Sequence, residues 1–213
     1  MMDYKLISAD SHVSEPTDLW VERVDKRYRD RAPRLVKNPA DPNGAYFHYE
    51  GYQPHPIGIG LAAGKSPEEL AQFLTQGTYA DARPGGWDPA ERLKDNELDG
   101  VEADVLYTTL GFRIFWLKDA GLQQDCFRVY NDWLAAYCNY APARMAGLAM
   151  ICLYDPKAGA QELAWTAPSS GGTTPPSSRS SASPASTSGA RCTAPTSTTM
   201  SASPTATSSG WIG

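Results

Sequence analysis

A carboxylate and an imidazole stand two positions apart near the start of the chain, within the segment SADSHVSEP at positions 8–16. A short apolar run comes just before them and predicts a strand over residues 5–10. Residues two apart in a strand project from the same face, so we expect Asp10 and His12 to point together at its carboxyl end. Carboxylate oxygen and imidazole nitrogen are suitable ligands for Zn²⁺ or a similar divalent ion. Asp10 and His12 are therefore candidate metal ligands.

The spacing alone leaves other roles open for both residues. A catalytic zinc ordinarily has three protein ligands and a water, so two ligands do not complete a site. Asp10 can instead cap a turn, and His12 can be a hydrogen-bonded loop histidine. Thr108 and Thr109 end a later strand and are candidates either for lining a pocket or for ordinary packing. Cys152 has no candidate base beside it, which argues against a nucleophilic role.

The elements that must position these residues alternate between strands and helices. Capping residues and Pro at the first helical turn mark several helix starts, and apolar periodicity marks the helix faces and the strands. The predicted strands are 5–10, 101–110 and 146–153, and the predicted helices are 17–29, 67–76, 88–100, 121–140 and 156–165. A hairpin and a Gly-rich loop, about 34–65, form an insertion after the first strand. Such alternation indicates an α/β fold with a parallel sheet covered by helices.

Composition excludes several classes of protein. The formal net charge is −5, with 24 acidic residues, which argues against the clustered basic surface of a nucleic-acid-binding protein. The N-terminus has no signal-peptide pattern, and the longest apolar segment, Ala146–Leu153, is too short to span a membrane. The cysteines form no CxxC pair and sit among apolar neighbours, so we expect reduced thiols in a cytoplasmic protein.

The composition changes sharply at about residue 165. Ser, Thr, Pro, Ala and Gly make up nearly all of residues 166–213, and only Arg179 and Arg191 carry charge there. Apart from Trp211 and Ile212, such a segment lacks the large branched and aromatic residues that strands bury, so we expect a low-complexity, disordered tail. A flexible linker and an interaction tail are two interpretations of this segment. A third, which we favour, is a shifted reading frame, and reading the gene in its other two frames would test it.

Three segments carry a resemblance to a known family. ISADSHVSEPTDLW, WDPAERLKDNELDGVEADVLYTTLG and YNDWLAAYCNYAPARMAGLAMICLYDPKAG resemble, in order and spacing, the amidohydrolase-related branch of the metal-dependent hydrolase (amidohydrolase) superfamily. That branch contains aminocarboxymuconate-semialdehyde decarboxylase and related aromatic-acid decarboxylases. The resemblance covers roughly residues 4–165. It implies a (β/α)8 TIM-type barrel with a divalent metal, often zinc, at its carboxyl-end mouth.

The resemblance also indicates what to look for in the rest of the chain. The family's first-strand pair of ligands falls on Asp10 and His12. The family supplies a further His from a middle strand and a catalytic Asp from a late strand, and neither can be placed here. The only other histidines, His48 and His55, lie in the insertion, and no Asp follows Asp155. A barrel of this type needs about 250 residues, so residues 1–165 are expected to be its amino-terminal portion.

Two hypotheses about function follow. The first is a metal-dependent hydrolase or non-oxidative decarboxylase that acts on a small carboxylate or amide, present here as its amino-terminal part. By resemblance, its cofactor is expected to be zinc and it is expected to form a homo-oligomer; no nucleic acid or membrane partner is expected. The second is a catalytically inactive fragment or scaffold with an interaction tail. The sequence does not separate hydrolysis from decarboxylation.

Overall fold

The computed structural model describes residues 5–38 and 41–166, all of which lie in one compact unit, Met1–Pro175. The predicted tail lies outside these residues, apart from Thr166 at the end of the last helix. The strands are β1 (Leu6–His12), β2 (Arg34–Asn38), β3 (Asp41–His48), β4 (His55–Pro56), β5 (Val101–Tyr107) and β6 (Met145–Gly147). The α-helices are α1 (Leu19–Arg23), α2 (Pro67–Gln76), α3 (Pro89–Asp99), α4 (Ala120–Cys138) and α5 (Pro156–Thr166). The 3₁₀ helices are η1 (Lys26–Arg31), η2 (Gly58–Leu61), η3 (Tyr79–Asp81), η4 (Pro84–Gly86) and η5 (Gly111–Trp116).

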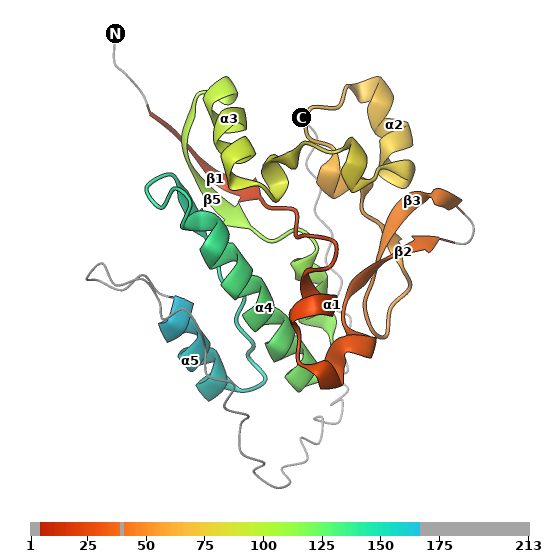
Figure 1. Ribbon diagram of the computed structural model, residues 1–213, viewed down its shortest axis with the longest axis vertical. Helices are drawn as coiled ribbons and strands as arrows, with labels where there is room; N and C mark the ends of the chain where they lie inside the picture. Colours follow the sequence, from red (N-terminus) through yellow and green to blue (C-terminus); the bar gives the residue numbers. More distant parts are fainter. Residues whose placement is uncertain (1–4, 39–40, 167–213) are drawn as a thin grey trace, which may run out of the picture. The chain divides into compact units, whose positions relative to one another are not determined.

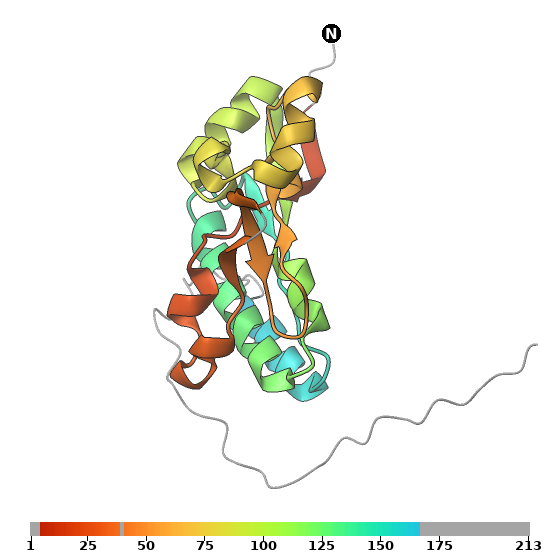
Figure 2. The same ribbon diagram turned by 90° about the vertical axis from the view of Figure 1, so that its right-hand side faces the viewer.

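The strands form two separate sheets in the described part of the chain. β1, β5 and β6 form a parallel sheet in that order, with β5 in the middle. β2, β3 and β4 form an antiparallel sheet from the insertion between β1 and β5. Parallel strands joined through helices are the α/β arrangement that the alternation predicts, so the parallel sheet and the hairpin are confirmed. In Figures 1 and 2, α2 and α3 lie at one end of this unit and α5 at the other.

The helix predicted over residues 17–29 is wrong, because the chain breaks there into α1 and η1. Val24 is extended, with φ −68° and ψ 158°, and ends α1. The Asp25 side chain then accepts a hydrogen bond from the backbone N–H of Arg27 and starts η1 as a new N-cap. An Asp side chain that bonds the backbone locally competes with a continuous helix. The apolar periodicity that predicted one helix is therefore divided between two short helices, α1 and η1.

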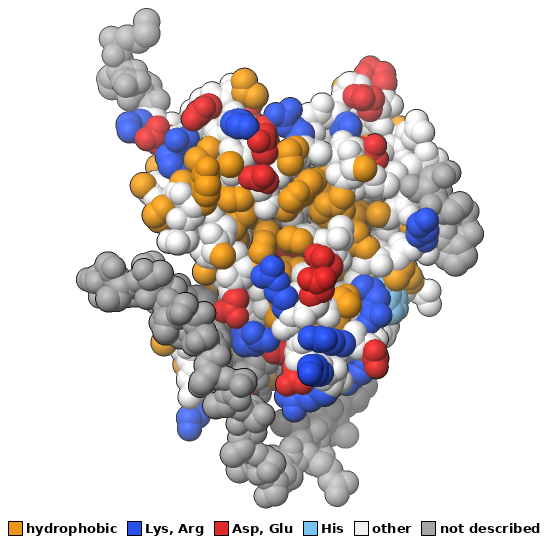
Figure 3. Space-filling view, in the orientation of Figure 1, with side chains coloured by type: hydrophobic (Ala, Val, Ile, Leu, Met, Phe, Trp, Pro, Cys, Tyr) orange, Lys and Arg blue, Asp and Glu red, His pale blue; other side chains and the backbone are white. Residues whose placement is uncertain are grey.

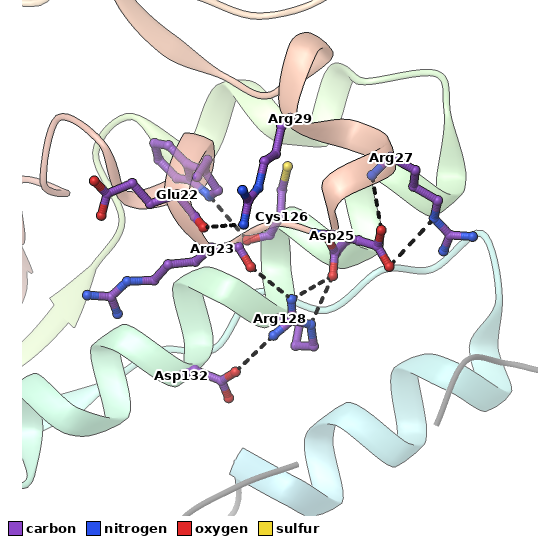
Figure 4. Close-up of polar contacts among 10 residues, drawn as sticks. Glu22, Arg23, Asp25, Arg27, Arg29, Cys126, Arg128 and Asp132 are labelled. Carbon is purple, nitrogen blue, oxygen red and sulfur yellow. Dashed lines mark hydrogen bonds and ion pairs between the residues drawn. The ribbon is translucent and has the colours of Figure 1, made fainter. Parts of the chain in front are cut away.

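The segment that contains α1 and η1 is held on α4 by polar contacts (Figure 4). The backbone N–H of Asp25 donates to the Asp125 carboxylate at 2.6 Å. Arg128 donates to the other oxygen of that carboxylate and to the backbone carbonyl of Arg23, at 2.7 and 3.4 Å from the same nitrogen. The contacts to the Asp25 N–H and to the Arg23 carbonyl each satisfy a backbone group where a helix begins or ends. The position of α1 and η1 relative to α4 is therefore fixed by these hydrogen bonds.

The third strand of the parallel sheet is much shorter than predicted. β6 covers only Met145–Gly147, whereas the apolar pattern predicted 146–153. Asn131 of α4 explains the early end of this strand. Its side chain donates to the Met150 carbonyl and accepts from the Met150 N–H, both at 2.9 Å. These backbone groups are thereby taken from the sheet, so the apolar segment packs beside α4 without extending the ladder.

The core lies between the parallel sheet, α1, α4 and the insertion. It includes Trp20, Phe47, Leu106, Ile114, Leu122, Phe127 and Tyr130, all buried. Both outer strands of the sheet expose large apolar side chains nearby: Leu6 and Ile7 on β1 are 55% and 62% exposed, and Leu148 just after β6 is 40% exposed. Figure 3 shows that hydrophobic side chains also gather on one face of the molecule. None of the helices in the described residues combines the length and hydropathy needed to cross a bilayer.

Gly100 ends α3 in the left-handed conformation, with φ +69° and ψ 23°. A Cβ added there meets no atom within 4 Å, so only the backbone conformation resists substitution. We expect Gly100→Ala to lower the free energy of unfolding by about 1 kcal/mol, the cost of that conformation for an L-residue. Urea denaturation measures the change. Gly100→Asn should cost less, because Asn tolerates this conformation; equal costs would contradict the explanation.

Candidate functional site

Asp10 and His12 lie at the carboxyl end of β1, on the same side of the strand. His12 Nε2 is 3.7 Å from Asp10 Oδ1. The His12 side chain is 44% exposed and the Asp10 side chain is 86% exposed, so neither is buried in the core. In parallel β/α structures this end of the strands is where active sites form. The alternation inferred from the sequence thus brings both candidate ligands together at the expected edge.

The other nitrogen of the His12 ring is anchored on the neighbouring strand. His12 Nδ1 is 2.8 Å from the backbone carbonyl oxygen of Thr108, just after β5. A carbonyl oxygen only accepts, so this hydrogen bond requires a proton on Nδ1. Nδ1 is also 3.4 Å from the Thr109 hydroxyl, which already donates to the Val13 carbonyl at 2.6 Å. In the neutral ring Nε2 is then the bare nitrogen, and it is the one that faces Asp10.

This is the arrangement in which histidines bind metals. A metal-ligating His ordinarily donates its second ring N–H to a carboxylate or a backbone carbonyl, which fixes both tautomer and ring orientation. Aromatic rings also flank His12: the centroids of Tyr107 and Phe112 lie 5.7 and 6.0 Å from its own. The imidazole therefore has a defined orientation before any ligand binds. Thr108 and Thr109, open between pocket and packing roles from sequence, contribute here as anchors of His12.

Glu15 is a buried carboxylate two residues before the predicted helix at 17–29, and no sequence pattern marks it as part of a site. Its side chain is fully buried. Oε1 accepts from the backbone N–H groups of Thr109 and Gly111, both at 3.1 Å, and Oε2 accepts from that of Leu110 at 2.9 Å. The Thr108 hydroxyl also donates to Oε1. Burial raises the pKa of Glu15 above its ordinary value, and the hydrogen bonds from Thr108, Leu110 and Gly111 oppose that rise.

A second buried carboxylate, Asp104, ties β1 to β5 and α3 from within. Arg92 Nε donates to its Oδ2 at 3.0 Å, Asn96 Nδ2 donates to the same oxygen at 2.5 Å, and Ser11 Oγ donates to Oδ1 at 2.9 Å. Burial acts to raise the pKa of Asp104, but these donors outweigh it and hold the pKa below its ordinary value. Arg92 also donates to the His12 carbonyl at 3.0 Å. The backbone of β1 is therefore fixed on both sides of His12.

A cavity of about 470 Å³ opens beside His12. It is lined by His12 and Ser14, by residues 59–63 of the insertion and by residues 82–83 and 85–86 before α3, together with Arg92, Asp95 and Thr109. The inserted loop thus forms one wall of the cavity, and the volume suits a small molecule. Of the two candidate ligands, His12 lines this cavity; Asp10 stands outside its lining.

The two remaining histidines, His48 and His55 of the insertion, are not among the residues that line this cavity. His55 packs between aromatic side chains, with its ring centroid 5.9 Å from those of both Phe47 and Tyr49. Burial holds the pKa of His55 below its ordinary value, and the positive charge of Arg113 acts in the same direction. His48 pairs with Arg34 across the hairpin. Neither residue joins Asp10 and His12.

Within residues 5–38 and 41–166, no three His, Cys, Asp or Glu side chains are grouped so that they could hold a metal ion. Asp10 and His12 thus fit a divalent metal by donor type and by the orientation of Nε2, but they supply only two ligands. The described cysteines, Cys126, Cys138 and Cys152, are free thiols. The Cys152 thiol contacts Gln123 Oε1 at 3.3 Å, which gives it a packing role.

Comparison with known proteins finds similarity in structure and not in sequence. No protein-family model and no curated protein matches the chain. An amidohydrolase from Mycobacterium avium subsp. paratuberculosis K-10 superposes on it with a TM-score of 0.56 and 17% identity. The match covers 77% of this chain and 47% of that protein. What the two share is the fold. The mixed helix and strand arrangement is therefore consistent with part of a TIM-type barrel.

The chain spans about half the length of that amidohydrolase structure. A 2,6-dihydroxybenzoate decarboxylase from Rhizobium also matches, with a TM-score of 0.37 and 18% identity, over 75% of this chain and 33% of that one. A score at that level is too low to establish a common fold. The relation to barrel proteins therefore comes from the amidohydrolase.

Proposed function

We propose that Asp10 and His12 are two ligands of a divalent metal, zinc by preference, in a hydrolase or non-oxidative decarboxylase for small carboxylates or amides. One observation carries this proposal. The Thr108 carbonyl at 2.8 Å fixes the proton of His12 on Nδ1, and the bare Nε2 faces the Asp10 carboxylate.

The chemistry follows from the donor set and the cavity. When bound, a divalent metal lowers the pKa of a coordinated water or orients a substrate carboxylate. Asp10 and His12 would hold it, Thr108 and Thr109 would keep the imidazole oriented, and the inserted loop 59–63 would limit the size of the substrate. The fold similarity to an amidohydrolase supports this class of reaction.

The proposal includes an incomplete barrel over residues 1–165. Three parallel strands are described where a TIM-type barrel has eight. Both outer strands, β1 and β6, pair only with β5 among the described residues. In a complete barrel these edges would be covered by further strands, which would also supply the remaining His and Asp. Residues 166–213 are not part of that barrel in this proposal.

A catalytically inactive fragment or scaffold is the second candidate function. It is favoured by the absence of a third potential ligand near Asp10 and His12 within the described residues. The exposed Leu6 and Ile7 at one edge of the sheet also favour association with another polypeptide. Under this alternative the 213-residue chain would bind metal weakly or not at all.

Metal titration of the purified 213-residue chain separates these candidates. We expect the wild type to bind Co²⁺ or Zn²⁺, and Asp10→Asn and His12→Gln each to weaken binding by at least about 100-fold. Loss of a direct ligand should cost no less than the 10–100-fold loss seen for groups that only support ligands. Isothermal calorimetry and the absorbance of bound Co²⁺ measure the affinity.

His48→Gln is the matched control, because it removes an imidazole of the inserted hairpin that lies outside the cavity lining. It should leave metal affinity within about twofold of wild type. Equal affinities in all four proteins would refute the assignment of Asp10 and His12. No binding by the wild type would favour the inactive fragment for this polypeptide.

A further inference from the structure

Glu15 is the most completely buried charged side chain near the candidate site, and the proposed metal chemistry leaves it without a role. The Glu15 carboxylate accepts three backbone N–H groups, from Thr109, Leu110 and Gly111, as well as the Thr108 hydroxyl. Its backbone carbonyl accepts in turn from the Tyr79 hydroxyl at 2.5 Å. The groups that anchor it lie far along the chain, in residues 108–111 and at Tyr79.

The segment that Glu15 holds is the turn between β5 and η5. The N–H groups that begin a helical turn have no partner within that turn, and those of Thr109, Leu110 and Gly111 lie at the start of η5. A buried N–H group without an acceptor costs about 1–3 kcal/mol. The Glu15 carboxylate supplies acceptors for three consecutive N–H groups and so selects one conformation of the turn.

That conformation determines the partner of His12. Thr108 takes part in both interactions: its hydroxyl donates to Glu15, and its carbonyl accepts from His12 Nδ1. Thr109 repeats the pattern, since its N–H donates to Glu15 and its hydroxyl bonds the Val13 carbonyl beside His12 Nδ1. A change in the turn would therefore move the acceptor away from Nδ1.

We propose that Glu15 is a positioning residue that fixes the tautomer of His12 by holding the 108–111 turn, and this inference rests on the proposed metal-binding role of His12. Glu15 does not touch His12 and acts through Thr108 and Thr109. It makes Nδ1 the protonated nitrogen and leaves Nε2 bare toward Asp10. Its effect on metal binding comes from this choice, beyond any contribution to folding.

The decisive variant is Glu15→Gln, which keeps the size of the side chain. An amide has one acceptor oxygen where the carboxylate has two, so at least one donor of the turn loses its partner and faces an NH₂ group. We expect a mixture of His12 tautomers and about a 10-fold loss of Co²⁺ affinity, the lower end for a supporting group. Histidine-selective ¹⁵N NMR of the metal-free 213-residue chain reports the tautomer directly.

Only three histidines are present, so the His12 signals can be assigned with His12→Gln. Asn131→Leu is the stability control, because it removes hydrogen bonds to Met150 and Glu162 but none in the 108–111 turn. It should lower thermal stability and leave the tautomer and the Co²⁺ affinity unchanged. If Glu15→Gln does not fold, Thr108→Val removes the one side-chain donor to Glu15, and should shift tautomer and affinity the same way by a few-fold.

The outcomes separate this inference from the proposed function. Wild-type metal binding that depends on Asp10 and His12, with tautomer and affinity unchanged in Glu15→Gln, overturns the role of Glu15 alone. A wild type that binds no metal overturns the proposed function, while the NMR comparison still decides whether Glu15 sets the tautomer. A tautomer shift shared by Asn131→Leu would reduce the effect to general stability and contradict the inference.

Discussion

Arg92→Met is expected to lower the free energy of unfolding by about 3–5 kcal/mol, the usual cost of removing one partner of a buried ion pair. The Asp104 carboxyl is 2% exposed, and Arg92 is its charged partner at 3.0 Å. Met fills a similar volume but leaves that carboxylate without a neutralising charge. It also removes the donor to the His12 carbonyl. Urea denaturation at pH 7 measures the loss.

The pH dependence gives this prediction a second test. The folded-state pKa of Asp104 lies below its ordinary value of 3.8, because the donors around it, Arg92 foremost, outweigh the effect of burial. A carboxyl with a depressed pKa stabilises the fold above its unfolded pKa and loses that contribution as the pH falls through the folded pKa. The difference between wild type and Arg92→Met should thus be full near pH 7 and shrink below about pH 4.

Arg83→Met is the matched control for Arg92→Met. Arg83 pairs with Asp95, but its side chain is 50% exposed. Exposed pairs contribute about 1 kcal/mol or less, so this variant should stay close to wild type at every pH. Similar losses for both variants would contradict the role assigned to burial of Asp104.

Trp20→Ala is the other substitution with a large expected effect, again about 3–5 kcal/mol. Trp20 is 2% exposed and packs against Phe47, with ring centroids 5.6 Å apart. Its Nε1–H donates to the Cys126 carbonyl on α4 at 3.1 Å. The change leaves a cavity between the turn after β1, the hairpin and α4. Equilibrium denaturation followed by circular dichroism measures the loss.

Trp116→Ala provides the comparison for the tryptophan of the core. Trp116 is 49% exposed, and its ring lies under the Arg113 guanidinium at 5.2 Å. Losing that contact should cost about 1 kcal/mol or less. If Trp20→Ala destabilises the chain too strongly to measure, Trp20→Phe preserves part of the packing. Comparable effects at positions 20 and 116 would show that Trp20 is not a core anchor.

The helices that could be predicted most closely, α2 at both ends and α3 to within one residue, are those with local signals at their ends. α2 follows Ser66, which forms a capping box with Glu69, and α3 follows Asp88, with Pro at the first position of both helices. These signals depend on neighbours a few residues away, which the sequence displays directly. The break between α1 and η1 escaped prediction because the apolar spacing continues across Asp25. The Asp25 side chain caps a new helix there, and this local hydrogen bond ends the helix that the apolar periodicity predicts.

The candidate site shows the same division between near and distant contacts. The spacing of Asp10 and His12 was enough to predict that they share one side of a strand, and the structure places them 3.7 Å apart. Glu15 could not be recognised in this way. All the donors to its carboxylate lie in residues 108–111, far along the chain, and the Glu-Pro pair resembles a routine helix entry. The metal-ligand role remains a prediction.

The pairing of β1 with β5 has a consequence for the order in which the protein assembles. Leu6 pairs with Val101, and the whole antiparallel insertion lies between them in the chain. During synthesis β1 emerges first, but its partner strand appears only after the hairpin, α2 and α3 have been made. Closing so long a loop is slow compared with forming local hairpins and helices. The segment that carries Asp10 and His12 is thus synthesised well before β5, and its pairing has to wait for that strand.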